Sequence, residues 1–111
     1  MKPLSIGKLR GLQQCTTPRG TFTCLALDHR QNLRKANPAF VADAELSRFK
    51  LDVTRLLAKQ ATAVLLDPEV SAAQAIAERA IPGGVGLVVA VESTGYTGDA
   101  TARHAQITPG W

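Results

Sequence analysis

The sequence predicts an α/β fold in which helices alternate with the strands of a parallel sheet. Three short apolar runs, at residues 21–27, 61–66 and 85–91, are typical of strands buried on both faces. Each run is followed by an acidic residue, and helical patterns lie before and between the runs. Because this alternation requires crossover connections, we expect parallel strands joined by right-handed crossovers.

The helices are predicted from apolar spacing and from side chains that can cap a first turn. We expect helices within residues 4–14 and at residues 44–59 and 72–80, with Ser5, Asp43 and Ser71 as the respective capping candidates. The apolar face of the second helix is expected to comprise Leu46, Phe49, Val53, Leu56 and Leu57. The charged residues expected to lie mostly off that face are Arg48, Lys50, Asp52 and Arg55. Residues 94–111 show no convincing helix or strand.

Length and composition limit the protein to one small domain. The 111 residues are 45% hydrophobic and 20% charged, and no apolar run reaches the ~20 residues of a membrane span. The first ten residues lack the apolar stretch of a secretory signal. Cys15 and Cys24 show no zinc-binding spacing, and Cys24 is expected to be a buried thiol. A reduced, cytoplasmic setting fits this cysteine usage best.

The charge is unevenly spread along the chain. Residues 1–59 carry eleven Lys and Arg against four Asp and Glu, whereas residues 60–111 carry two against five. A basic half can bind nucleic acid or anionic small molecules. Because the basic residues are scattered and few aromatic residues lie among them, we expect solvated helix faces and no nucleic-acid binding.

Acidic residues stand where each predicted strand ends, namely Asp28, Asp67 and Glu92. The carboxyl ends of adjacent parallel strands meet at one rim, where ligands bind in α/β folds. Such carboxylates can bind Mg²⁺, hydrogen-bond sugar hydroxyls or exchange protons. Arg30 can pair with Asp28 or with a phosphate. Two plainer roles stay open: Asp67 precedes Pro68 and can fix a turn, and His29 can serve a structural hydrogen bond.

Several nucleotide-binding and hydrolase motifs are absent from the sequence. No P-loop, GxSxG or HExxH pattern occurs, and the glycines at residues 83–86 precede a strand, which is the wrong context for dinucleotide binding. His104 lies alone in a polar stretch and is expected to be solvated.

Five segments resemble the tagatose-1,6-bisphosphate aldolase family, which includes sulfofructose-phosphate aldolases. In chain order they are Ile6-Gly7-Lys8-Leu9-Arg10-Gly11-Leu12-Gln13-Gln14, Leu25-Ala26-Leu27-Asp28-His29-Arg30, Phe49-Lys50, Leu65-Leu66-Asp67-Pro68-Glu69 and Val91-Glu92-Ser93-Thr94-Gly95-Tyr96. The resemblance implies a (β/α)₈ barrel and a class I mechanism, in which a lysine forms a Schiff base with the substrate ketone.

The resemblance also implies roles for the rim residues. Asp28 matches a catalytic acidic residue beside the Schiff base, and Arg30 matches an arginine near the sugar phosphate. Asp67 and Glu92 are expected to bind the substrate. The implied substrate is a phosphorylated sugar, cleaved to dihydroxyacetone phosphate and glyceraldehyde 3-phosphate, with no metal and no cofactor.

The chain departs from the family in length. A complete barrel needs about 250 residues, so this chain is expected to form one partial domain, residues 1–111, with about three of eight βα units and an N-terminal helix. The family's Schiff-base lysine and proton-handling glutamate come from later strands, and Lys8, Lys50 and Lys59 are not expected to replace that lysine. An open sheet would expose Leu27, Leu65 and Val89, which would otherwise fill the barrel core.

Two functional hypotheses follow from these observations. The first is an aldolase portion that is inactive alone, marginally stable and prone to form homo-oligomers. The second is a small non-catalytic α/β module that binds a phosphorylated ligand or a protein partner. A monodisperse, cooperatively folding chain would favour the second hypothesis.

Overall fold

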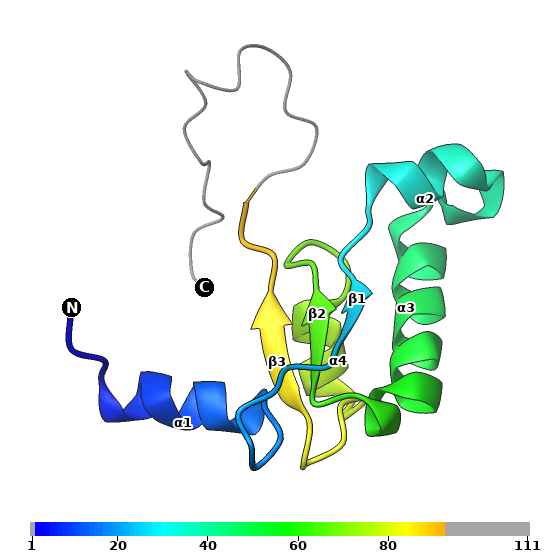
Figure 1. Cartoon of the computed structure of the whole chain (residues 1–111). Helices are drawn as coiled ribbons and strands as arrows, with labels where there is room; N and C mark the ends of the chain where they lie inside the picture. The colour runs from blue at the N-terminus through cyan, green and yellow to red at the C-terminus, as the bar shows by residue number, and fades with distance from the viewer. Residues whose placement is uncertain (1, 93–111) are drawn as a thin grey trace.

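A three-stranded parallel sheet with helices packed on it forms the centre of the molecule (Figure 1). The computed structural model describes residues 2–92. The α-helices are α1 (Ile6–Gln14), α2 (Gln31–Ala36), α3 (Asp43–Leu57) and α4 (Ala72–Ala77), and the 3₁₀ helices are η1 (Pro38–Phe40) and η2 (Ala58–Gln60). The strands are β1 (Cys24–Leu27), β2 (Ala63–Leu66) and β3 (Gly86–Val89). The predicted α/β alternation and parallel sheet are confirmed.

The order of the strands in the sheet is β1-β2-β3, the same as their order in the chain. Cys24 lies opposite Ala63, which lies opposite Gly86, and the register continues without a bulge to the other end of the strands. The three carboxyl ends therefore form one rim, as the sequence predicts. None of the helices among residues 2–92 is long and apolar enough to cross a membrane.

The main core lies between one face of the sheet and helices α3 and α4. Buried side chains from the helices, β2 and the segment after α4 form it, namely Leu51, Val64, Leu66, Ala72, Ala75 and Ala80. Leu25, Leu27, Leu87 and Val89 from the outer strands pack against this cluster and stay half-buried. Leu27 and Val89 therefore do not face the barrel interior as predicted, because they point to the helix side of the sheet.

The opposite face of the sheet is covered at the amino end of β3. Helix α1 lies beside β3 (Figure 1), and Cys15, just after this helix, is only 6% exposed. A side-chain carbon added at Gly86 would stand 2.5 Å from the Cys15 sulfur and 2.9 Å from its Cα. The close approach of these two segments thus depends on glycine at this position.

Strand β1 is less buried than predicted. Cys24 and Ala26 are exposed, while Leu25 and Leu27 are half-buried, so the prediction of a strand covered on both faces is wrong. The prediction that Cys24 is a buried thiol is wrong for the same reason: within the described residues β1 is an outer strand, and the helices cover only one of its faces. Only β2 approaches the predicted burial.

Helix α3 also presents a different face from the one predicted. Its buried side chains are Leu46, Lys50, Leu51 and Thr54. Leu56 is 74% exposed and Leu57 44% exposed, while the Phe49 ring lies at the edge of this face, 4.8 Å from the Phe40 ring. The placement of Lys50 off the apolar face is therefore wrong, because its stem packs along the buried stripe and its ammonium group finds a partner there.

The capping predictions have mixed outcomes. The Ser5 hydroxyl accepts a hydrogen bond from the Lys8 backbone N–H at 3.2 Å, as predicted for α1. Asp43 is not a cap, because it is the first residue of α3 and its carboxylate accepts a 2.6 Å bond from Arg34. Ser71 occupies the capping position of α4 but directs its hydroxyl to Asp67 instead.

Candidate functional site

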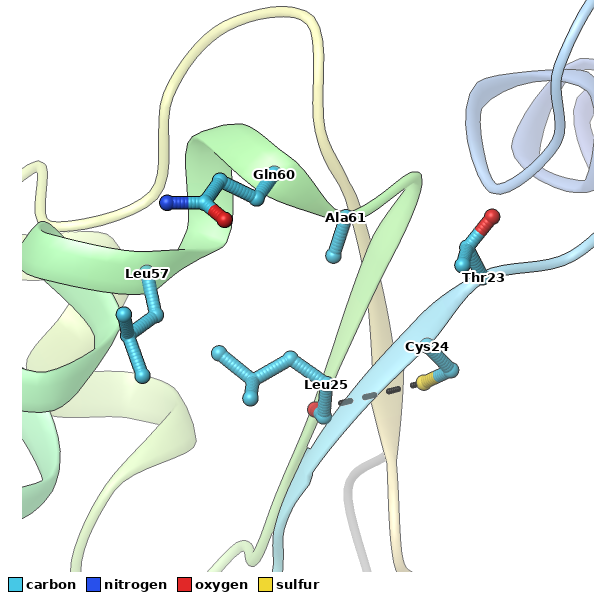
Figure 2. A pocket seen from close by; sticks show the side chains of 6 residues that line it. All are labelled: Thr23, Cys24, Leu25, Leu57, Gln60 and Ala61. Atoms are coloured by element: carbon cyan, nitrogen blue, oxygen red, sulfur yellow. Dashed lines mark hydrogen bonds between the residues drawn. The ribbon is translucent and has the colours of Figure 1, made fainter.

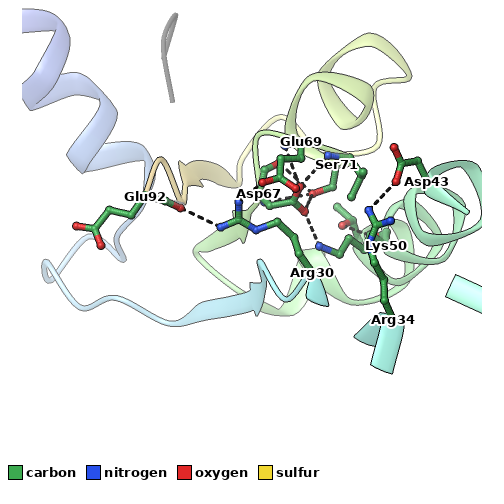
Figure 3. A network of polar contacts seen from close by, with 10 residues as sticks. Arg30, Arg34, Asp43, Lys50, Asp67, Glu69, Ser71 and Glu92 are labelled. Atoms are coloured by element: carbon green, nitrogen blue, oxygen red, sulfur yellow. Dashed lines mark hydrogen bonds and ion pairs between the residues drawn. The ribbon is translucent and has the colours of Figure 1, made fainter. Parts of the chain in front are cut away.

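The segments that follow the three strands meet at the side chain of Arg30 (Figure 3). The Arg30 guanidinium donates through Nη1 to the Glu69 carboxylate at 2.7 Å and through Nη2 to the Glu92 backbone carbonyl at 3.0 Å. Arg30 comes two residues after Asp28, Glu69 follows β2 and Glu92 follows β3. This one side chain therefore ties together the loops after all three strands.

Arg30 is buried although it carries a charge. Its side chain is 3% exposed, whereas that of its partner Glu69 is 47% exposed. The Arg30 Nε is also buried, and no acceptor lies within hydrogen-bond distance of it among residues 2–92. A buried guanidinium needs a carboxylate and hydrogen bonds to offset the loss of water, and Glu69 and the Glu92 carbonyl supply them.

Asp67 organises the turn that follows β2. It is fully buried, and its Oδ1 accepts the backbone N–H groups of Glu69 at 3.0 Å and Val70 at 2.8 Å. Its Oδ2 accepts the Ser71 hydroxyl at 2.6 Å and the Lys50 ammonium. These contacts match the plainer of the two roles open from sequence, because Asp67 fixes the turn.

Lys50 is the residue that sequence reasoning missed. It projects from α3 to Asp67 with no exposed surface, and both members of this ion pair are fully buried. A signal was present in the sequence: Lys50 lies four residues after Leu46 and four before Thr54, on the stripe that is buried in α3. Asp67, which follows the next strand, β2, supplies the carboxylate that pairs with Lys50.

The electrostatics of the pair follow from its burial. Burial lowers the pKa of the Lys50 ammonium, and the hydrogen bond to Asp67 opposes that shift. For Asp67, burial acts to raise the pKa, but hydrogen bonds from Lys50, Ser71 and the Val70 backbone outweigh it and hold the pKa below its ordinary value. Asp67 is therefore ionised at neutral pH, and its negative charge opposes the loss of the proton from Lys50.

Asp28 and His29 lie differently at the rim. Asp28 is half-buried and close enough to Lys50 for its negative charge to raise the pKa of that lysine, whereas His29 is exposed. Within residues 2–92, no group donates a hydrogen bond to the Asp28 carboxylate. The Glu92 side chain points away from Arg30 (Figure 3). The same part of the chain contains no cluster of three or more His, Cys, Asp or Glu side chains suited to a metal ion.

An apolar hollow lies along the outer edge of β1, away from this polar network. It has a volume of about 270 Å³ and is lined by Thr23, Cys24, Leu25, Leu57, Gln60 and Ala61 (Figure 2). The residues that line it include no charged side chain.

Comparison with known proteins finds tagatose 1,6-diphosphate aldolases among the relatives of this chain. No family model matches the chain. It is 32% identical over 114 residues to Tagatose 1,6-diphosphate aldolase 2 of Enterococcus faecalis (strain ATCC 700802 / V583), which covers 100% of this chain and 34% of the aldolase. It is 35% identical over 105 residues to Tagatose 1,6-diphosphate aldolase 1 of the same strain, covering 93% of this chain and 31% of that protein.

The chain therefore spans about a third of the length of the curated relatives it matches. The resemblance predicted from its motifs is confirmed: across nearly all of its residues, this chain is similar to tagatose 1,6-diphosphate aldolases.

Proposed function

We propose that this chain is part of a class I aldolase that cleaves a ketohexose bisphosphate such as tagatose 1,6-bisphosphate. The observation that carries the proposal is the identity of 32% to a tagatose 1,6-diphosphate aldolase over the whole chain. A rim that places Asp28 beside the ends of three parallel strands supports it. A cytoplasmic setting, in keeping with two free thiols, is part of the same proposal.

The fold in this proposal is the first part of a (β/α)₈ barrel. The strands of the described sheet follow one another in chain order, all are parallel, and α3 and α4 pack on the same face. A barrel is built from such units and needs about 250 residues. In the proposal, β1 and β3 pair with strands outside the described residues, and one of those strands supplies the Schiff-base lysine.

The chemistry assigned to this chain is electrostatic and acid–base. In a class I aldolase the lysine iminium withdraws the electron pair of the breaking carbon–carbon bond, while a base takes the proton of the neighbouring hydroxyl. The Asp28 carboxylate can stabilise the iminium charge and accept hydrogen bonds from substrate hydroxyls. We assign Asp28 as a catalytic residue and Glu92 as a substrate-binding residue. Substrate contacts from Arg30 and Asp67 stay a prediction.

The experiment uses a chimera in which this chain replaces the segment it aligns with in the Enterococcus faecalis aldolase 2. We expect the chimera to cleave tagatose 1,6-bisphosphate, and borohydride to trap the substrate covalently on it. The isolated chain should do neither. A folded chimera that neither cleaves nor traps the substrate would overturn the proposal.

A further inference from the structure

Two basic side chains at the rim are buried, Lys50 with no exposed surface and Arg30 with 3% exposed. We propose that both are positioning residues: Arg30 holds the Glu92 segment in place, and Lys50 holds the turn that carries Glu69, the carboxylate partner of Arg30. This inference rests on the proposed function for its catalytic consequence, because it assigns Arg30 a role other than binding the sugar phosphate.

The Arg30 guanidinium is buried and already bonded to protein acceptors. An arginine that binds a phosphate group must direct its N–H groups at the phosphate oxygens, usually through two parallel hydrogen bonds. In Arg30 both terminal nitrogens already donate, one to the Glu69 carboxylate and one to the Glu92 carbonyl, and the side chain is 3% exposed. A phosphate that approached Arg30 would also meet the negative charge of Glu69.

The position of Glu69 depends on Lys50. The turn at residues 67–70 is closed by the Asp67 carboxylate, which accepts two backbone N–H groups. That carboxylate is buried and stays ionised through Lys50 and Ser71. Without the lysine charge, a buried Asp67 would be uncompensated, and it would take up a proton or move. Either change loosens the turn and displaces Glu69 from Arg30.

These contacts form one continuous path. It runs from Lys50 on α3 through Asp67 to the backbone of residues 69 and 70, then through Glu69 and Arg30 to the Glu92 carbonyl. The path ends on the segment that carries the proposed substrate-binding carboxylate of Glu92. Helix α3, on the far side of the core, therefore sets the geometry of the rim without touching the substrate.

The chimera separates a positioning role from a phosphate ligand. We expect Arg30→Lys and Glu69→Gln each to lower kcat by about tenfold, with KM for the bisphosphate changed less than about twofold. The double variant should be no worse than Arg30→Lys alone, because both changes break the same contact. Inhibition by inorganic phosphate should not change. If Arg30 binds the phosphate, Arg30→Lys raises KM and weakens phosphate inhibition, while Glu69→Gln does neither.

A second test uses the isolated chain and does not depend on any activity. In Lys50→Met, amide hydrogen exchange at Glu69 and Val70 should speed up at least about tenfold, because the Asp67 carboxyl group that accepts from both N–H groups takes up a proton or moves. The Gly86 N–H, bonded to the Thr62 carbonyl at 2.9 Å at the other end of the sheet, reports the overall loss of stability, and its exchange should speed up at least about tenfold less than that of Val70. Lys59→Met, at an exposed lysine, is the matched control.

The two tests also distinguish the inference from the proposed function. A chimera without activity would refute the proposed function and leave the exchange result standing. Equal acceleration at Val70 and Gly86, or none at Val70, would overturn the inference about Lys50. If Lys50→Met does not fold, Ser71→Ala, which removes one donor to Asp67 and leaves both charges, should show the same local acceleration to a smaller degree. No acceleration at Val70 in that variant would contradict the inference equally.

Discussion

Lys50 on α3 and Asp67 after β2 form an ion pair in which neither side chain has any exposed surface. The two residues are 17 positions apart in the chain, and their pairing joins the long helix to the end of the central strand. A buried pair of this kind contributes little net stability compared with apolar residues, but the loss of one partner is costly. It therefore fixes the arrangement of the rim more than it stabilises the fold.

Removal of one member of the pair should destabilise the chain strongly. Lys50→Met keeps the volume but leaves Asp67 buried without its counter-charge, so we expect a loss of about 3–5 kcal/mol in the free energy of unfolding. Urea denaturation measures it. Asp67→Asn should cost a similar amount, and the double variant should cost clearly less than the sum. Additive losses would show that the pair is not coupled, and Lys59→Met should change stability by less than about 0.5 kcal/mol.

The acid stability of the chain should depend on Asp67. Because the folded state holds the pKa of Asp67 below its ordinary value, the unfolded chain binds that proton more readily. The stabilisation is therefore complete above the unfolded pKa of about 4 and is lost as the pH falls through the folded pKa. Urea midpoints measured from neutral to acid pH should fall in this window. The urea midpoint of Asp67→Asn should fall less steeply with decreasing pH than that of the unchanged chain. If the two slopes are identical, Asp67 does not control the acid stability.

The contact between Cys15 and Gly86 predicts a steric effect. Gly86→Ala would place a methyl group 2.5 Å from the Cys15 sulfur and 2.9 Å from its Cα, so we expect a loss of about 1–3 kcal/mol. Cys15→Ala should rescue it only in part, because the backbone contact remains. Gly84→Ala is the control, since no atom lies within 4 Å of the added carbon. Equal stability of the two alanine variants would show that α1 does not pack against β3 in solution.

The fold class was predictable because its signals are local. The apolar runs, the acidic residue after each run and the alternation with helices identified the sheet and its rim. The burial of β1 was not predictable from the run itself, since Cys24 and Ala26 are exposed only because no element among residues 2–92 covers their face. The apolar run alone does not indicate which other strands and helices will pack against β1 and bury it.

The site was less predictable because it depends on long-range partners. The spacing of Phe49, Leu56 and Leu57 predicted that these residues form the buried face of α3, but they are exposed. The residues that are buried include Lys50 and Thr54. Lys50 is buried because Asp67, at the end of β2, pairs with its ammonium group, and this tertiary contact overrides the local apolar spacing. Likewise, the motif that contains Arg30 indicates a functional position. It does not indicate whether the Arg30 guanidinium binds a phosphate or, as in the structure, the Glu69 carboxylate.

The isolated chain should self-associate. Within the described residues, β1 and β3 each have one unpaired edge, and α3 and α4 expose Leu56, Leu57 and Ile76. Sedimentation velocity should show oligomers whose fraction grows with concentration, and Ala26→Lys with Leu57→Lys should shift the chain toward the monomer. A monodisperse, cooperatively unfolding monomer would instead favour a small non-catalytic binding module.

Single-turnover cleavage of tagatose 1,6-bisphosphate by the chimera shows whether Asp28 of this chain acts in an aldolase site. We expect Asp28→Asn to lower the cleavage rate by about 10²–10⁴-fold while the protein stays folded. Asp52→Asn, at an exposed position on α3, should leave the rate unchanged. A chimera whose cleavage rate is the same with Asp28→Asn as without it would show that Asp28 takes no part in the reaction.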